Sequence, residues 1–228
     1  MTKKTAALEI NLGYTLMLFA VNLCLSYGAP AVAQTMQQIP QKERRISMRV
    51  QQKPFPEILV ELSRKHQIPI GFQVSDSKES DGCNKPLDIS FQEAGIVQVM
   101  NSLASICTAY SWEISDEVVN VFPIVKHKSV LDAIIPRIIV SDQTSDEILG
   151  HLFDIKEVKR ELQSSGLRWD TTTSSLQGGA KNPPKHSFSQ LNKSLKDIMN
   201  YIVSHTENRF WIYYILSDDK CAFSLRVF

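Results

Sequence analysis

One pattern of strand-like and helix-like segments occurs twice between residues 46 and 228. Apolar residues alternate with polar ones where a strand is expected, and recur every three or four positions where a helix is expected. Both copies have the order β-α-β-β-α-β-β. The repeat predicts an α+β fold of two tandem small modules, in which helices pack against small sheets. The first copy contains Ile46–Val50, Phe55–Leu62, Ile68–Val74, Leu87–Phe91, Ile96–Leu103, Tyr110–Ile114 and Val118–Phe122, and the second contains Arg137–Val140, Ile148–Leu162, Leu167–Thr171, His186–Leu191, Leu195–Ile202, Phe210–Leu216 and Cys221–Phe228.

Length and composition agree with this organisation. The 228 residues are enough for two modules of roughly 90 residues each. The composition, 43% hydrophobic and 21% charged, is typical of a folded protein and argues against a disordered chain. The formal net charge is +1, and it becomes zero once Lys3, Lys4 and Glu9 are removed. Charge therefore indicates neither a nucleic-acid groove nor a polybasic membrane surface.

Residues 1–33 have the pattern of a cleaved secretory signal peptide. Lys3 and Lys4 precede an apolar stretch, Tyr14–Leu25, and Ala31-Val32-Ala33 matches the small-residue rule for cleavage. The alternative is an uncleaved anchor, but a bilayer span needs about 20 apolar residues and only about 12 are present. We therefore expect a periplasmic or secreted protein whose mature chain has no membrane span.

The rest of the chain divides into four parts. Residues 34–45 are polar and Gln-rich, which predicts a flexible arm. The first module covers residues 46–123, a linker covers 124–136, and a second, looser module covers 137–228.

In the second module, a capping box at Thr144 and Glu147 predicts the start of a helix. Two interpretations of the following segment stay open. It forms one long helix as far as Leu162, or Asp154 caps a second short helix.

Three cysteines follow the leader: Cys83, Cys107 and Cys221. An oxidising compartment permits a disulfide, and an odd number leaves one thiol over. Cys83 precedes the strand Leu87–Phe91, and Cys107 ends the helix that follows it, so these two ends are expected to meet in a bond. Cys107 also continues the apolar stripe of its helix, and burial there is compatible with the bond. Cys221 is expected to be a lone thiol.

The segment Phe210–Leu216 is the most apolar part of the mature chain, and both of its strand faces are apolar. Such a strand is usually central in a sheet and covered on both sides. Burial against the first copy is therefore one interpretation. The alternative is an exposed partner surface formed by Trp211, Tyr213 and Ile215.

Motifs that carry catalysis are missing from the sequence: it has no G-x-S-x-G, Walker loop, H-E-x-x-H or C-x-x-C. His151 and Asp154 are three residues apart and could share one helix face. A pair without further ligands indicates a solvated face rather than a metal site. We predict no catalytic, cofactor-binding or metal-binding residues, and no enzyme.

The first copy carries an ordered set of short segments. They are Ile46–Val50, Pro54–Leu62, Ile68–Ile70, Leu87–Phe91, Val97–Leu103, Tyr110–Ile114 and Val119–Val121. With these segments it resembles the short N-terminal (STN) domain shared by secretins and TonB-dependent receptors, which the second half follows more loosely. The resemblance implies a small periplasmic α/β module used for protein–protein contact. Because no series of alternating membrane strands occurs before Phe228, we expect a stand-alone relative.

Together, these observations predict an exported, non-catalytic interaction module that binds an envelope protein through exposed strand edges. The alternative is a periplasmic small-ligand or glycan binder, with the Gly178-Gly179 loop over a groove between the copies. A hydrolase is a lesser alternative. Neither a cofactor nor a nucleic-acid partner is expected.

Overall fold

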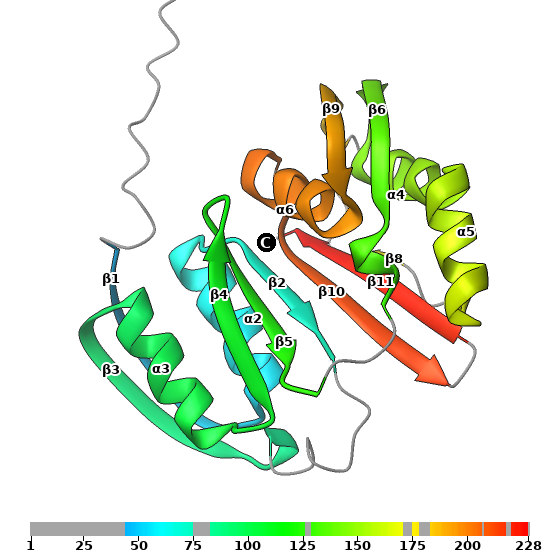
Figure 1. The fold of residues 1–228 in the computed structure, drawn as a ribbon. Helices are drawn as coiled ribbons and strands as arrows, with labels where there is room; N and C mark the ends of the chain where they lie inside the picture. The colour runs from blue at the N-terminus through cyan, green and yellow to red at the C-terminus, as the bar shows by residue number, and fades with distance from the viewer. Residues whose placement is uncertain are drawn as a thin grey trace, which may run out of the picture. The chain divides into compact units, whose positions relative to one another are not determined.

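In the computed structural model both halves of the chain contain the order β-α-β-β-α-β-β, and the second half has one more helix (Lys156–Ser165) and one more strand (Ser175–Gln177) (Figure 1). The structure describes residues 44–74, 83–125, 129–170, 175–177, 183–206, 208–217 and 220–227. The leader (1–33), the arm as far as residue 43, and the Gly178-Gly179 loop lie outside these ranges.

The fold is α+β, as the repeat predicts. The first half comprises β1 (Arg45–Lys53), α2 (Phe55–His66), β2 (Ile70–Gln73), β3 (Leu87–Gly95), α3 (Ile96–Ile106), β4 (Tyr110–Ser115) and β5 (Val118–Pro123). The second comprises β6 (Ile134–Gln143), α4 (Ser145–Asp154), α5 (Lys156–Ser165), β7 (Arg168–Trp169), β8 (Ser175–Gln177), β9 (His186–Ser194), α6 (Leu195–His205), β10 (Asn208–Ser217) and β11 (Lys220–Val227).

Strand pairing repeats as well. β1 pairs with β3 in an antiparallel two-stranded sheet, and β6 pairs with β9 in the same way. The strand order β4-β5-β2 of the first half recurs as β10-β11-β7 in the second. In each set the last strand is parallel to the middle one and the first is antiparallel to it. The two halves are therefore built on one topology.

The halves are joined through their sheets. β2 pairs in parallel with β10, from Ile70 opposite Phe210 to Gln73 opposite Tyr213, and this makes one seven-stranded sheet that includes β8. All described residues belong to a single compact unit, Pro40–Phe228. The expected division into two separate modules, 46–123 and 137–228, is therefore not confirmed, because the halves share a sheet.

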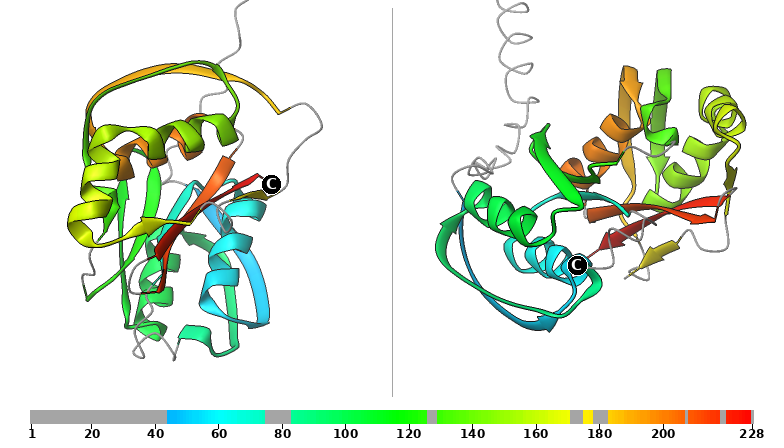
Figure 2. Two further views of the ribbon diagram at one scale, coloured as in Figure 1. Left: turned by 90° about the vertical axis from the view of Figure 1, so that its right-hand side faces the viewer. Right: turned by 60° about the horizontal axis from the view of Figure 1, so that its bottom comes forward.

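Each half nevertheless keeps its own hydrophobic core, and the shared sheet separates the two. Alternate residues of β10 face opposite sides: Phe210 belongs to the core of the first half, whereas Trp211 and Tyr213 belong to that of the second. β5 does the same with Val119 and Val118. Consequently α2 and α6 cover opposite sides of β10, as the right-hand view of Figure 2 shows. A strand that is apolar on both faces is suited to this position.

Local signals explain the helix boundaries. α2 begins after Pro54, with Pro56 in its first turn, where a missing N–H has no intrahelical partner to lose. α4 begins with the predicted capping box: the Glu147 carboxylate accepts from the Thr144 N–H at 2.7 Å, and the Thr144 hydroxyl accepts from the Glu147 N–H at 3.4 Å. α5 ends at Gly166, whose left-handed backbone suits a residue without a Cβ.

The long-helix interpretation is wrong. The helix is interrupted at Ile155, which has an extended backbone, and α5 starts after this residue. The second helix exists, but its N-cap is Ile155 rather than Asp154. The half-buried Ile155 side chain packs against the core of the second half, which favours an apolar residue at the break.

Two predicted boundaries also move. The linker 124–136 ends earlier, because Val130–Asp132 forms a 3-10 helix and β6 already begins at Ile134. Val130 and Leu131 are buried, so this part belongs to the core of the second half. At the other end, the last residues of the predicted arm are ordered: Arg45 starts β1, and Arg44 donates to the carbonyl of His66 at 3.0 Å.

Candidate functional site

The outer face of the β6–β9 pair carries exposed apolar side chains. Ile139 and Leu191 are 50% and 60% exposed, and Ile134, at the start of β6, is 56% exposed. Ile139 lies two residues from Arg137, and Arg137 is directly opposite Leu191, so the two apolar side chains are diagonal neighbours on one face. We name Ile139 and Leu191 the outer apolar face.

The matching face of the β1–β3 pair is polar. The registers of the two pairs give the correspondence: Arg45 opposite Gly95 matches Ile134 opposite Ser194, and Arg49 opposite Ser90 matches Ile139 opposite Ser189. Leu191 corresponds to Gln92 by the same registers. One fold thus presents arginines and a glutamine in its first half where its second half presents isoleucines and a leucine.

Equivalent bulges near the ends of β1 and β6 support the match of Arg49 with Ile139. Gln52 and Asp142 both have positive φ angles near the ends of β1 and β6. The N–H of Gln52 donates to the Asp88 carboxylate at 2.9 Å, and the N–H of Asp142 donates to the Ser187 hydroxyl at 2.9 Å. Asp88 and Ser187 are each the second residue of the partner strand. A bulge capped in the same way fixes the register in both halves.

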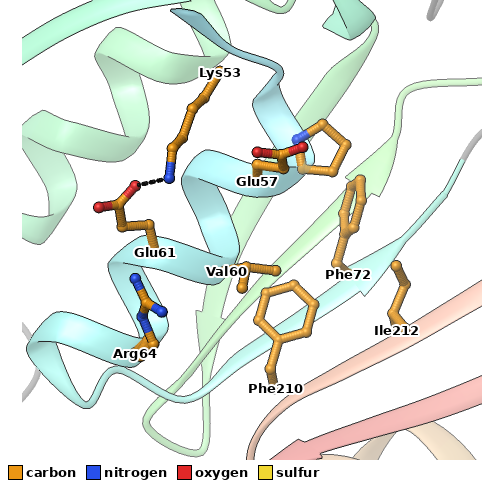
Figure 3. A pocket seen from close by; sticks show the side chains of 9 residues that line it. Lys53, Glu57, Val60, Glu61, Arg64, Phe72, Phe210 and Ile212 are labelled. Carbon is orange, nitrogen blue, oxygen red and sulfur yellow. Dashed lines mark hydrogen bonds and ion pairs between the residues drawn. The ribbon is translucent and has the colours of Figure 1, made fainter. Parts of the chain in front are cut away.

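A second feature is a pocket of about 210 Å³ beside α2 (Figure 3). Its apolar floor comes from α2, β2 and β10, and its rim is charged. Since β10 belongs to the second half, the pocket exists only because the two halves share a sheet. It is lined by Lys53, Pro56, Glu57, Val60, Glu61, Arg64, Phe72, Phe210 and Ile212.

Glu61 is the buried charge of this pocket. Its side chain is 8% exposed and forms ion pairs with Lys53, at 2.7 Å, and with Lys65. Hydrogen bonds from Lys53 and then Lys65 lower the pKa of Glu61 from 4.5 to about 2, against the opposing effect of burial. Glu61 is therefore ionised at neutral pH, and each of its two oxygens pairs with one lysine.

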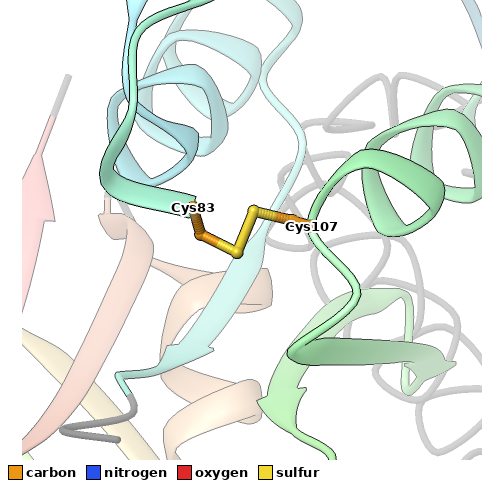
Figure 4. Close-up of a disulfide and its surroundings, with 2 residues drawn as sticks. All are labelled: Cys83 and Cys107. Atoms are coloured by element: carbon orange, nitrogen blue, oxygen red, sulfur yellow. A yellow bond between two sulfur atoms is a disulfide. The ribbon is translucent and has the colours of Figure 1, made fainter. Parts of the chain in front are cut away.

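The predicted cysteine pair is present: Cys83 and Cys107 form a disulfide, with their Cα atoms 5.2 Å apart (Figure 4). Both side chains are buried, so the bond closes the core of the first half. Cys221 is a buried free thiol. Burial raises the pKa of Cys221 to about 11, which keeps the sulfur protonated at neutral pH.

The predicted partner surface on β10 is wrong for two of its residues. Trp211 is fully buried and Tyr213 is 3% exposed, because β10 is central and α6 covers this face. The Trp211 indole N–H donates to the Asn200 side-chain oxygen of α6 at 2.9 Å. The side chain of Ile215 lies outside the description. Burial raises the pKa of Tyr213, consistent with a phenol held in the core.

Two remaining sets of residues concern chemistry. His151 and Asp154 both lie on α4, and the described residues contain no group of three or more potential metal ligands around them or elsewhere. On α6, the Ser204 hydroxyl lies 2.7 Å from the His205 ring, but it also donates to the Asn200 carbonyl at 2.8 Å. A hydroxyl with its proton engaged in the helix is not an activated nucleophile.

Comparison with known proteins finds no family model that matches the chain and no similar curated protein. Among the helices within the described ranges, none is long and apolar enough to cross a lipid bilayer.

Proposed function

We propose that this chain is an exported, non-catalytic interaction module of the cell envelope, related to the short N-terminal domains of secretins and TonB-dependent receptors. The observation that carries the proposal is the contrast between the two outer faces. Isolated exposed apolar residues are ordinary, but Ile139 and Leu191 are diagonal neighbours on one sheet face, at positions that are polar in the sister half, and they mark a surface with a distinct role.

The geometry suits a protein partner. Within the described part of the chain, β6 and β9 pair only with each other, so the outer edge of each strand offers backbone groups to an added strand. Main-chain hydrogen bonds would supply affinity, and contacts with Ile139 and Leu191 would supply selectivity. Arg137 lies between these two side chains on the same face and is exposed, which favours a partner segment that mixes apolar and acidic residues.

Two further features support export. The predicted leader would direct the chain out of the cytoplasm. A buried disulfide between Cys83 and Cys107 suits an oxidising compartment, where such bonds form and persist.

The proposal is tested by giving the second half the residues of the first. The variant Ile139→Arg, Leu191→Gln should fold normally, because both positions are half exposed or more. It should lose the envelope partner that the unmodified protein retains in affinity capture. The reciprocal change, Arg49→Ile, is the control and should leave that partner bound. Retention of the same partner by the first variant would contradict the proposal.

A second candidate function, a periplasmic small-ligand or glycan binder, is favoured by the pocket beside α2. Thermal-shift screening of the mature protein against glycans, peptidoglycan fragments and small amphipathic acids would test it. A saturable rise in Tm that is lost on substitution of a pocket residue such as Val60 would support it. A hydrolase ranks below both, because no described residue has the arrangement of an activated nucleophile.

A further inference from the structure

The pocket beside α2 combines an apolar floor with an unevenly charged rim. Phe72 and Phe210 are fully buried beneath it, and Val60 and Ile212 are half buried along its sides. Ligand sites for drug-sized molecules typically measure about 300–1,000 Å³. A pocket of about 210 Å³ is therefore sized for one apolar group, such as an aromatic side chain.

The charges on the rim favour an anion at one end. Lys53 and Glu61 both line the pocket and neutralise each other in an ion pair at 2.7 Å. Arg64 is the other cation of the rim, and no described residue forms an ion pair or side-chain hydrogen bond with its guanidinium. Glu57 carries the opposing charge seven residues earlier on α2, so the positive end of the rim is the Arg64 end (Figure 3).

We propose that this pocket binds an apolar group that carries a carboxylate, with the apolar part against Val60 and Ile212, above Phe72 and Phe210, and the carboxylate paired with Arg64. A guanidinium matches a carboxylate in a two-bond geometry, which a lysine does not provide. A small amphipathic acid and the C-terminal aromatic residue of a peptide share this chemistry. The proposal deepens the ligand-binding alternative and does not depend on the outer apolar face.

The test is a titration of the full mature protein with small probes, in which NMR signals of the backbone amides report binding. The probes are 3-phenylpropionate, its neutral amide, and the peptide acetyl-Ala-Ala-Phe with a free or amidated C-terminus. Binding should shift the amides of α2 and the start of β10, and each acid should bind more tightly than its amide. The two acids distinguish the natural sources of the ligand. Binding of the peptide acid alone would indicate that the pocket recognises a peptide C-terminus. Binding of phenylpropionate, alone or together with the peptide acid, would indicate that an aromatic group with a carboxylate is sufficient.

Matched variants locate the carboxylate. Arg64→Gln should raise the Kd of the acid at least about fivefold, because a charge-assisted pair is lost. Lys65→Gln is the control, since Lys65 is the adjacent cation but does not line the pocket. It should change the Kd less than about twofold, because an exposed charge outside the pocket interacts weakly with the bound carboxylate. Val60→Thr should weaken acid and amide alike.

The proposal is overturned if neither acid gives a saturable shift, if acid and amide bind equally, or if the two cation variants have the same effect. Arg64 is exposed and no described residue forms an ion pair with it, so Arg64→Gln should melt at the temperature of the unmodified protein. Lys65→Gln should melt slightly lower, because it removes one of the two ion pairs of Glu61. Loss of envelope-partner binding through Ile139 and Leu191 would leave these titrations unchanged, so failure of either proposal is recognised separately.

Discussion

The Trp211 indole of β10 lies against the backbone of Gly71 in β2, where any side chain would occupy the same space. These residues are direct partners in the parallel register that joins the two halves. The hydrogen bond from the indole to Asn200 then fixes the ring beneath α6. The shared sheet thus depends on one glycine, one tryptophan and one buried amide.

Gly71→Ala should destabilise the protein by about 1–3 kcal/mol, because the new methyl group collides with a ring that cannot move away. Chemical denaturation measures the free energy of unfolding. The control is Gly150→Ala, in the middle of α4, where a Cβ meets nothing within 4 Å. That variant should be neutral or more stable by up to about 1 kcal/mol. Equal effects of the two substitutions would show that Gly71 does not hold the junction.

The sequence predicts much of the local structure but not how the halves join. Alternating apolar residues predict where most strands lie along the chain, and the capping box at Thr144 predicts the start of α4. The parallel pairing of β2 with β10 connects segments far apart in the chain, which no local pattern reveals. One signal was present in Gly71, since a glycine inside a strand marks a close approach of other atoms.

The candidate sites show the same limit. The doublets Ile134-Ile135 and Ile138-Ile139 place an apolar residue on each face of β6, so one of each pair must be exposed if the sheet is covered on one side only. The sequence alone does not show that these exposed isoleucines replace polar residues of the first half, because that requires the structural match with Arg45 and Arg49. The pocket could not be predicted, because its floor combines α2 with β10.

Removing the disulfide with Cys83→Ala, Cys107→Ala should lower the free energy of unfolding. The two cysteines are 24 residues apart, and a closed loop of that length corresponds to about 3.5 kcal/mol in the chain-entropy model. Denaturation with and without dithiothreitol checks the assignment. The reductant should destabilise the unmodified protein and leave the double variant unchanged, and an equal response of both proteins would argue against the bond.

Glu61→Gln should destabilise the protein in a pH-dependent way. The pKa of Glu61 is lower in the folded chain than its usual value of 4.5, so its ion pairs stabilise the fold above that pH. This contribution is lost as the pH falls through about 2. Because Lys53 and Lys65 are 37% and 46% exposed, solvent screens both pairs, and we expect about 1–2 kcal/mol at pH 7.

Unfolding curves at pH 7 and near pH 2 measure this difference. The gap between the unmodified protein and the Glu61→Gln variant should shrink as the pH falls. Glu113→Gln is the control: Glu113 pairs with Lys196 at 3.1 Å but is 47% exposed, so its loss should matter by less than about 0.5 kcal/mol. A gap that stays constant with pH would mean that Glu61 acts through packing and not through its charge.

Site-specific photo-crosslinking in cells tests the partner surface most directly. A photoreactive phenylalanine analogue would replace Ile139 or Leu191 in one set of strains, and the structurally equivalent Arg49 or Gln92 in the other. All four positions are exposed, so each variant should fold. We predict a discrete cross-linked partner from positions 139 and 191 and none from positions 49 and 92. The same product from both sets, or none from the first, would contradict a role for the outer apolar face.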